Sequence, residues 1–238
     1  STLFPYTTLF RSRTGPLVLW LVRSAPDDHA ERIDPAHCEG VRFDSALRTR
    51  VFWQLAAVFC LQALAIGGLI VHFIPLLTDK GIDRLTAAST AGIIGIAVIA
   101  GRLVVGALVD YIFAPHVAAV TLTLSGLGIL TLALGGPGMS PVAAFMIGFA
   151  VGAEVDLIGY LAVRYFGLRA YGRLYGCLYA AFILGTGVSP FWIGLVFDRV
   201  ASYRPALFVC AALLAAAALI FCALPRFPVS IAHREATT

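Results

Sequence analysis

The stretch Leu85–Val109, LTAASTAGIIGIAVIAGRLVVGALV, decides how this chain folds. It is 25 residues long, and its one charged side chain is Arg102. An α-helix rises about 1.5 Å per residue, so about 20 apolar residues cross the roughly 30 Å of hydrocarbon in a bilayer. We therefore predict that this stretch is a transmembrane helix.

The same pattern recurs along the chain. The apolar runs of spanning length are Val51–Leu77, Leu85–Val109, Val117–Leu134, Val142–Val163, Leu174–Phe197 and Ala206–Leu224. They do not alternate apolar and polar residues, as the strands of a transmembrane barrel do. Short polar turns separate them, so successive helices are expected to run antiparallel. The sequence predicts an all-α, polytopic membrane protein with six spans in residues 51–224.

The composition excludes a soluble enzyme and a disordered chain. Of the 238 residues, 60% are hydrophobic and 13% are charged, whereas soluble domains have about 45–50% and about 25%. Catalytic signatures such as G-x-S-x-G, H-E-x-x-H and a Walker-type loop are absent, so we expect no enzyme. The five cysteines form no C-x-x-C pair, and we expect neither a metal nor another cofactor. The basic residues lie between apolar runs, so we expect no nucleic-acid partner.

The sequence before and after the six runs has a different character. Thr2–Ser12, TLFPYTTLFRS, is what a common sequencing-adapter oligonucleotide encodes, so residues 1–12 are interpreted as an artefact. Residues 13–22 hold an apolar run too short to span a bilayer, and we interpret them as the remnant of a preceding transmembrane helix. Residues 23–50 are predicted to be a linker with a short surface helix before the membrane, and residues 225–238 a tail.

Lysine and arginine are distributed unevenly between the two sides of the predicted membrane. Six spans place the linker and the tail on one side, which carries 11 of these residues against four on the other. By the positive-inside rule, the linker and the tail are cytoplasmic, in the cell inner (plasma) membrane.

The second and fifth spans end alike. Gly106-Ala-Leu-Val-Asp110 closes one, and Gly194-Leu-Val-Phe-Asp198 closes the other. Each span is the middle helix of three, and three spans separate them, so the two ends emerge on opposite sides of the membrane. An inverted three-plus-three repeat, on which many transporters are built, requires this arrangement.

Three charged side chains inside the spans are candidate functional residues. A charge at the helix centre costs about 2.5–3.5 kcal/mol, so each needs a partner or a water-filled cavity. Arg102 either extends to the lipid headgroups or binds a carboxylate in a central cavity. Glu154 and Asp156 lie two residues apart and cannot share a helix face, so at least one must point toward neighbouring helices. Each is either a proton-coupling group or a structural hydrogen-bonding partner.

Further polar residues lie near the ends of the spans. Asp110 is expected to interact with Arg164 or with a loop backbone at the cytoplasmic face. His72 is interpreted as a hydrogen-bonded structural residue, with a ligand or proton relay as the alternative.

Small residues and proline predict local features of the helices. Gly148-x-x-x-Gly152 and Gly172-x-x-x-Gly176 are typical of closely packed helices. Gly185, Gly187, Ser189 and Pro190 are expected to break the fifth span at its middle, where a bend or a substrate-lining stretch would lie.

The segment Gly101–Asp110, GRLVVGALVD, resembles the signature at the inner end of the eighth helix of the major facilitator superfamily. Gly152–Gly176 resembles the tenth helix, the following loop and the start of the eleventh helix in bacterial members near the monocarboxylate transporters and the oxalate/formate exchanger. The resemblance covers about residues 16–228. It implies the C-terminal six-helix half of a major facilitator fold, helices seven to twelve, with an N-terminal six-helix half as its missing partner.

The resemblance also implies a substrate class. In the anion-transporting relatives, an arginine four residues before the motif glycine contacts the substrate carboxylate, and Arg102 stands there relative to Gly106. The exchanger carries a lysine in its eleventh helix, but Leu174–Phe197 has none, which favours a monocarboxylate. Monocarboxylate relatives carry an aspartate where this chain has Val98, and the superfamily often carries a basic residue where this chain has Tyr111.

These observations predict a secondary active transporter, proton-coupled or exchanging, for a small organic anion. Its partners would be that anion, protons and the lipid bilayer. The alternatives are a drug or metabolite efflux transporter of the same superfamily and a non-transporting membrane sensor or assembly protein.

Overall fold

A computed structural model describes residues 40–227. Our predictions for residues 1–12 and 13–22, for the linker before residue 40 and for the tail after residue 227 lie outside the described residues. The first helix of the described part, α2 (Phe43–Leu47), is the short helix expected at the end of the linker.

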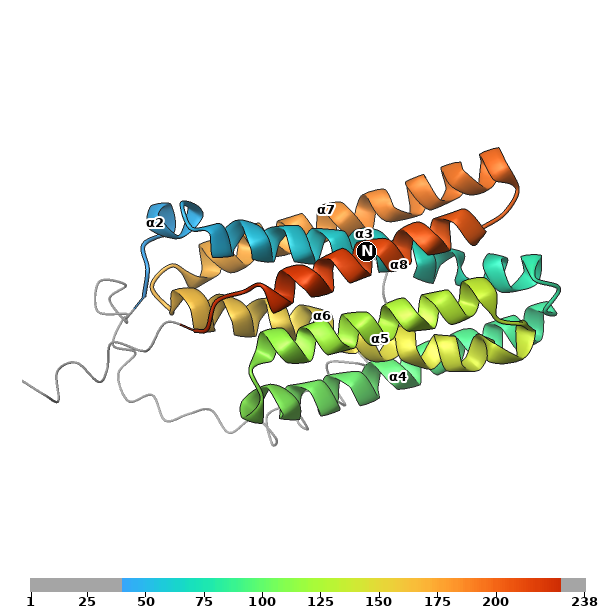
Figure 1. The fold of residues 1–238 in the computed structure, drawn as a ribbon, viewed down its shortest axis with the longest axis horizontal. Coiled ribbons are helices and arrows are strands. Elements are labelled where there is room, and N and C mark those ends of the chain that lie inside the picture. Colours follow the sequence, from blue (N-terminus) through green and yellow to red (C-terminus); the bar gives the residue numbers. More distant parts are fainter. Residues whose placement is uncertain (1–39, 228–238) are drawn as a thin grey trace, which may run out of the picture. The chain divides into compact units, whose positions relative to one another are not determined.

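Six long helices follow α2 (Figure 1). They are α3 (Arg50–Asp79), α4 (Arg84–Tyr111), α5 (Ala114–Leu134), α6 (Ser140–Phe166), α7 (Tyr171–Val200) and α8 (Arg204–Cys222). A single 3-10 turn, η1 (Pro137–Met139), leads into α6. All six are long and apolar enough to cross a membrane. Five of the predicted runs lie wholly inside these helices, and the last extends two residues beyond α8.

Each helix begins before its apolar run, because polar residues or prolines start several of them. The side chain of Asp83 accepts a hydrogen bond from the backbone N–H of Thr86 (2.9 Å) and caps α4. The hydrogen bonds from the side chain and backbone of Thr86 lower the pKa of the Asp83 carboxyl. Thr49 caps α3 in the same way, through Phe52 N–H. α5, α6 and α8 each have a proline in the first turn, where it costs no hydrogen bond.

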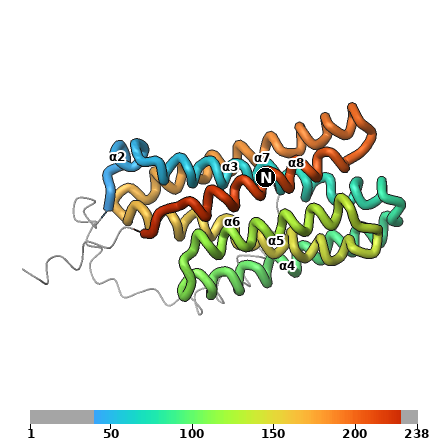
Figure 2. The backbone as a smooth tube through the Cα atoms, viewed as in Figure 1, coloured from blue at the N-terminus to red at the C-terminus, as the bar shows by residue number. Residues whose placement is uncertain are grey.

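The helices pack with an internal two-fold pattern. α3 packs along α7, α4 along α6 and α5 along α8, while α5 also packs on α6 and α3 on α8. In a two-fold repeat, α3 corresponds to α6, α4 to α7 and α5 to α8. Under this correspondence the α3–α7 contact matches the α6–α4 contact, and the α5–α6 contact matches the α8–α3 contact. The structure therefore shows the predicted inverted three-plus-three repeat, and Figures 1 and 2 show its helices side by side.

Small residues bring α4 and α6 into backbone contact. A Cβ atom on Gly148 would lie 2.6 Å from the carbonyl oxygen of Ile94, and one on Gly152 would overlap the carbonyl oxygen of Val98. From the other side, Gly101 of α4 lies against the backbone of Phe149. The close packing predicted for Gly148-x-x-x-Gly152 is therefore present. Within residues 40–227, neither Gly172 nor Gly176 has a neighbour within 4 Å of its Cβ position, so the described helices do not show the close packing predicted for Gly172-x-x-x-Gly176.

The α3–α7 contact uses polar groups in addition to small ones. Ser189 Oγ donates a hydrogen bond to Leu64 O (2.5 Å) and accepts one from Gly68 N–H (2.7 Å). Pro190 lies inside α7, yet α7 is continuous from Tyr171 to Val200, so the predicted break in the fifth span is wrong. Pro190 has no backbone N–H and so removes one hydrogen bond within α7. The hydrogen bonds from Ser189 to α3 hold α7 in place at this point.

Candidate functional site

α4 and α7 have the most exposed surfaces of the six long helices. In their most apolar stretches, 22% and 17% of the residues are buried, against 44% or more in the other four. The two-fold pattern relates α4 to α7, so the repeat leaves an equivalent helix with a largely exposed surface in each of its copies. These two helices are therefore the ones with surface available for a further body or for substrate.

An ion pair joins α4 to α6 on this exposed surface. Nε of Arg102 lies 2.9 Å from Oδ2 of Asp156, and the two side chains are 56% and 55% exposed. The backbones can come this close because Gly152, one turn before Asp156, packs directly against α4 at Val98. The structure thus brings together two of the charged residues singled out in the sequence.

A small cavity of about 210 Å³ lies beside the ion pair. From α4 it is lined by Arg102, Gly106 and Asp110, which share one helix face at intervals of four residues. From α6 it is lined by Asp156 and Tyr160, among others. Gly106 has no atom within 4 Å of its Cβ position, so its missing side chain leaves the cavity open.

Asp110 does not form the expected contact with Arg164 in the described part of the chain. The Arg164 guanidinium lies 4.8 Å from the centre of the Phe227 ring and 5.8 Å from that of Tyr160. Because two aromatic rings hold Arg164 by cation–π contacts, it is not turned toward Asp110. Asp110 is exposed and lines the cavity, while Tyr160 Oη donates a hydrogen bond to the neighbouring Val109 O (3.0 Å).

Glu154 and Asp156 point in different directions, as their spacing requires. Glu154 is 5% exposed, and its Oε1 has no hydrogen-bond partner among residues 40–227. The side chain that faces its carboxyl is Gln62 of α3, which is also buried. Glu154 is therefore a carboxyl group inside the bundle, separate from the exposed ion pair of its neighbour.

A row of aromatic side chains on α7 lies near Asp156 and was not identified from the sequence. Successive ring centres of Tyr171, Tyr175, Tyr179 and Phe182 lie 5.7–5.9 Å apart, and all but the first pair are stacked. The charge of Asp156 is close enough to act on the Tyr175 hydroxyl, and the Tyr171 hydroxyl lies beside Gly159 of α6. The signal that could have revealed this row is the four-residue spacing of the tyrosines, which places them on one helix face.

The second G-x-x-x-D end has a different environment. The position for a Cβ of Gly194 lies 3.8 Å from the His72 imidazole, whose Nε2 is 3.2 Å from Pro190 O. Tyr203 Oη lies 3.3 Å from the other ring nitrogen of His72. Burial and the charges of Asp79 and Asp198 raise the pKa of Tyr203, which favours the protonated, donating hydroxyl. His72 therefore has the structural role expected of it. It fills the space beside Gly194, whereas the equivalent space beside Gly106 in the other copy of the repeat is open.

A bundle of spanning helices with an inverted three-plus-three repeat is an architecture of secondary transporters. The chain belongs to the Major Facilitator Superfamily, because the model of that family matches residues 14–177, more than half of its length. The family is one of transporters, which agrees with the expectation that this protein is not an enzyme.

The chain is similar to one curated protein and to one solved structure over part of the length of each. The chain is 26% identical over 173 residues to YhjX of Escherichia coli strain K12, described as an uncharacterised MFS-type transporter. The match covers 70% of this chain and 42% of the relative. The fold is similar to that of the E. coli fucose:proton symporter FucP, with a TM-score of 0.67 and 18% identity. That likeness covers 92% of this chain and 54% of the symporter, so the chain has the fold of one six-helix half.

Proposed function

We propose that this chain is half of a secondary transporter that carries a small organic monocarboxylate. The observation that carries the proposal is the ion pair between Arg102 and Asp156 at an open cavity. A cationic group held at the edge of a cavity by an aspartate is suited to recognise an anion.

The geometry of the ion pair leaves one edge of the arginine for substrate. Asp156 contacts Nε, and within residues 40–227 no protein partner is found for the two terminal nitrogens. Those two nitrogens present parallel N–H donors, which match the two oxygens of a carboxylate. Asp156 would then orient Arg102, and the substrate would bind the outer edge of the guanidinium.

Asp156 would also connect substrate binding to protons. While it is ionised, it neutralises Arg102, and a proton on Asp156 leaves the arginine charge for the anion. We therefore propose that anion binding at Arg102 is coupled to a proton at Asp156. Val98 stands where monocarboxylate relatives carry an aspartate, so we propose that Asp156 supplies the missing carboxylate from α6. Glu154, buried with an oxygen that is unpaired among residues 40–227, is the second candidate for carrying a proton.

The proposal includes a second six-helix body. The chain spans about half the length of the solved symporter that it resembles and 42% of its curated relative. Transporter sites of this kind lie between two repeats near the middle of the membrane. The exposed surfaces of α4 and α7 would contact that body, and Arg102 and Asp156 would face the space between the two. By the positive-inside rule, we place the protein in the inner (plasma) membrane with its linker and tail in the cytoplasm.

One observation favours a different substrate. The aromatic row on α7 offers stacking surfaces near the ion pair, which suits an aromatic or amphipathic compound and a drug or metabolite efflux transporter. A sensor or assembly protein, the remaining alternative, would bind without transporting.

Transport by reconstituted protein tests the proposal. The complete reading frame, including any upstream sequence, and the chain of residues 1–238 are each placed in vesicles, and uptake of a labelled short monocarboxylate is measured with an inward proton gradient. We expect uptake by a protein that includes a second six-helix body and none by residues 1–238 alone. Uptake by the chain alone would contradict the need for a second body. Binding without uptake by the complete protein would favour the sensor.

A further inference from the structure

A second cavity, with a different chemical character, lies between the start of α3 and the end of α8. Its volume is about 610 Å³, and it shares no lining residue with the cavity beside Arg102. Arg48 and Arg50 line it on one side. Leu219, Ile220 and Ala57 line it on the other. We call this cavity the α3–α8 groove. Among the described residues, the two charged side chains that line the groove are both arginines.

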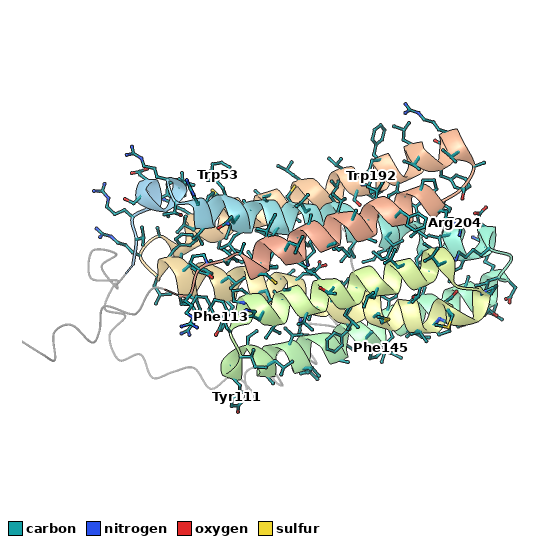
Figure 3. The ribbon with its side chains drawn as sticks, viewed as in Figure 1. Trp53, Tyr111, Phe113, Phe145, Trp192 and Arg204 are labelled. Atoms are coloured by element: carbon teal, nitrogen blue, oxygen red, sulfur yellow. The ribbon has the colours of Figure 1, made fainter. Side chains whose placement is uncertain are left out.

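Trp53 forms a wall of the groove with a defined orientation. Its side chain is 64% exposed, although tryptophan is strongly hydrophobic. Its indole N–H donates a hydrogen bond to Leu47 O (2.9 Å), and its ring packs edge-on against Phe52 with centres 5.5 Å apart. Figure 3 shows Trp53 projecting from the start of α3. Tryptophan held in this way at the end of a spanning helix is typical of the boundary between lipid headgroups and hydrocarbon.

The groove therefore combines two environments along the helix axis. The arginines lie at the first residues of α3 and just before it, at the membrane surface. The apolar side follows along α3 and α8 into the hydrocarbon, where Leu219 is 71% exposed. A water-soluble anion would match only the arginines, and a neutral lipid would match only the apolar side.

We propose that this groove binds an anionic phospholipid of the bilayer. Its phosphate would pair with Arg48 and Arg50, and an acyl chain would lie on Leu219, Ile220 and Ala57. Arginine pairs with phosphate through parallel N–H donors. Basic pockets between spanning helices are suited to anionic headgroups. The bound lipid would link the start of α3 to the end of α8.

Trp53 supplies the readout. Of the three tryptophans in the sequence, Trp20 and Trp192 are replaced by phenylalanine, so that Trp53 alone fluoresces. The chain is placed in phosphatidylcholine vesicles that contain a small fraction of phosphatidylglycerol with a brominated acyl chain. A parallel sample contains brominated phosphatidylcholine in the same fraction. Bromine quenches tryptophan on contact, so quenching by each lipid gives its relative occupancy beside Trp53.

We expect the anionic lipid to quench more strongly than the neutral one, and Arg48→Gln with Arg50→Gln to remove the preference. The expected loss is about fivefold per arginine, the fold-change that corresponds to about 1 kcal/mol per cationic side chain near an anionic membrane. The control, Arg199→Gln with Arg204→Gln, removes the same charge at the opposite end of the bundle and should keep the preference. Ala57→Phe fills the apolar side without a change in charge and should reduce quenching by the anionic lipid.

Three results would overturn the proposal. The first is equal quenching by the two lipids, and the second is an equal loss of preference in both double arginine variants, which would indicate an effect of net charge. The third is recovery of fluorescence on addition of inorganic phosphate, which would assign the arginines to a soluble anion. Insertion and folding of each variant are checked with the neutral lipid. A variant that has inserted and folded should show the same quenching by brominated phosphatidylcholine as the parent protein.

Discussion

Arg102→Lys in the complete transporter separates anion recognition from a structural role. Lysine keeps the charge near Asp156 but lacks the two parallel donors of the guanidinium. Losing one charge-assisted hydrogen bond costs about 1.5–3 kcal/mol, so the Kd for a monocarboxylate should rise about 10- to 150-fold. Because lysine keeps the positive charge beside Asp156, the midpoint of thermal unfolding should change little.

Both quantities can be measured on the same purified protein. Competition with a labelled monocarboxylate gives the Kd, and fluorescence-detected unfolding in detergent gives the midpoint. Arg199→Lys is the matched control, because Arg199 lies in the last turn of α7 and does not line the cavity, and it should leave the Kd unchanged. An Arg102→Lys protein that binds the anion with unchanged Kd would refute anion recognition by Arg102.

Five further substitutions test other parts of the account. Asp156→Asn should abolish the dependence of monocarboxylate uptake on an inward proton gradient, and uptake that still follows the gradient would assign proton coupling to another residue. Glu154→Gln should leave the anion Kd unchanged but lower proton-driven uptake, whereas unchanged uptake would exclude Glu154 as a proton carrier. Gly152→Leu should destabilise the protein by about 1–3 kcal/mol in thermal unfolding, because it overfills the α4–α6 contact. Gly106→Leu should fold normally and lose transport. The reverse pattern would contradict the packing described here. Asp83→Asn should lower stability at neutral pH but not at pH values below the lowered pKa of Asp83. The ionised cap stabilises α4 above the ordinary pKa of aspartate, and this stabilisation is lost as the pH falls through the lowered pKa. An equal loss of stability at both pH values would contradict this pH dependence.

The spans and their symmetry could be predicted from the sequence because both depend on local pattern. Long apolar runs identify spanning helices without knowledge of their neighbours. The matching ends at Asp110 and Asp198 were enough to suggest the inverted repeat. The different directions of Glu154 and Asp156 follow from the 100° turn per helical residue, and the burial of one and exposure of the other confirm it.

The partners of individual side chains could not be predicted, since they depend on which helix faces meet. Asp156 lies 54 residues after Arg102, and no local pattern connects them. Arg164 was expected at Asp110, but it packs on aromatic rings instead. The spacing of Gly172 and Gly176 is the same as that of Gly148 and Gly152, yet within residues 40–227 only the second pair faces another helix. A spacing motif identifies a smooth helix face and does not show whether another helix covers it.

The central claim is recognition of a carboxylate, and competition between isosteric compounds tests it most directly. Uptake of a labelled short monocarboxylate by the complete transporter in vesicles is measured with increasing amounts of the unlabelled acid or of its primary amide, which has nearly the same shape and no charge. We predict that the acid competes and that the amide, at a tenfold higher concentration, does not. Equal competition by the amide, or none by the acid, would contradict the account.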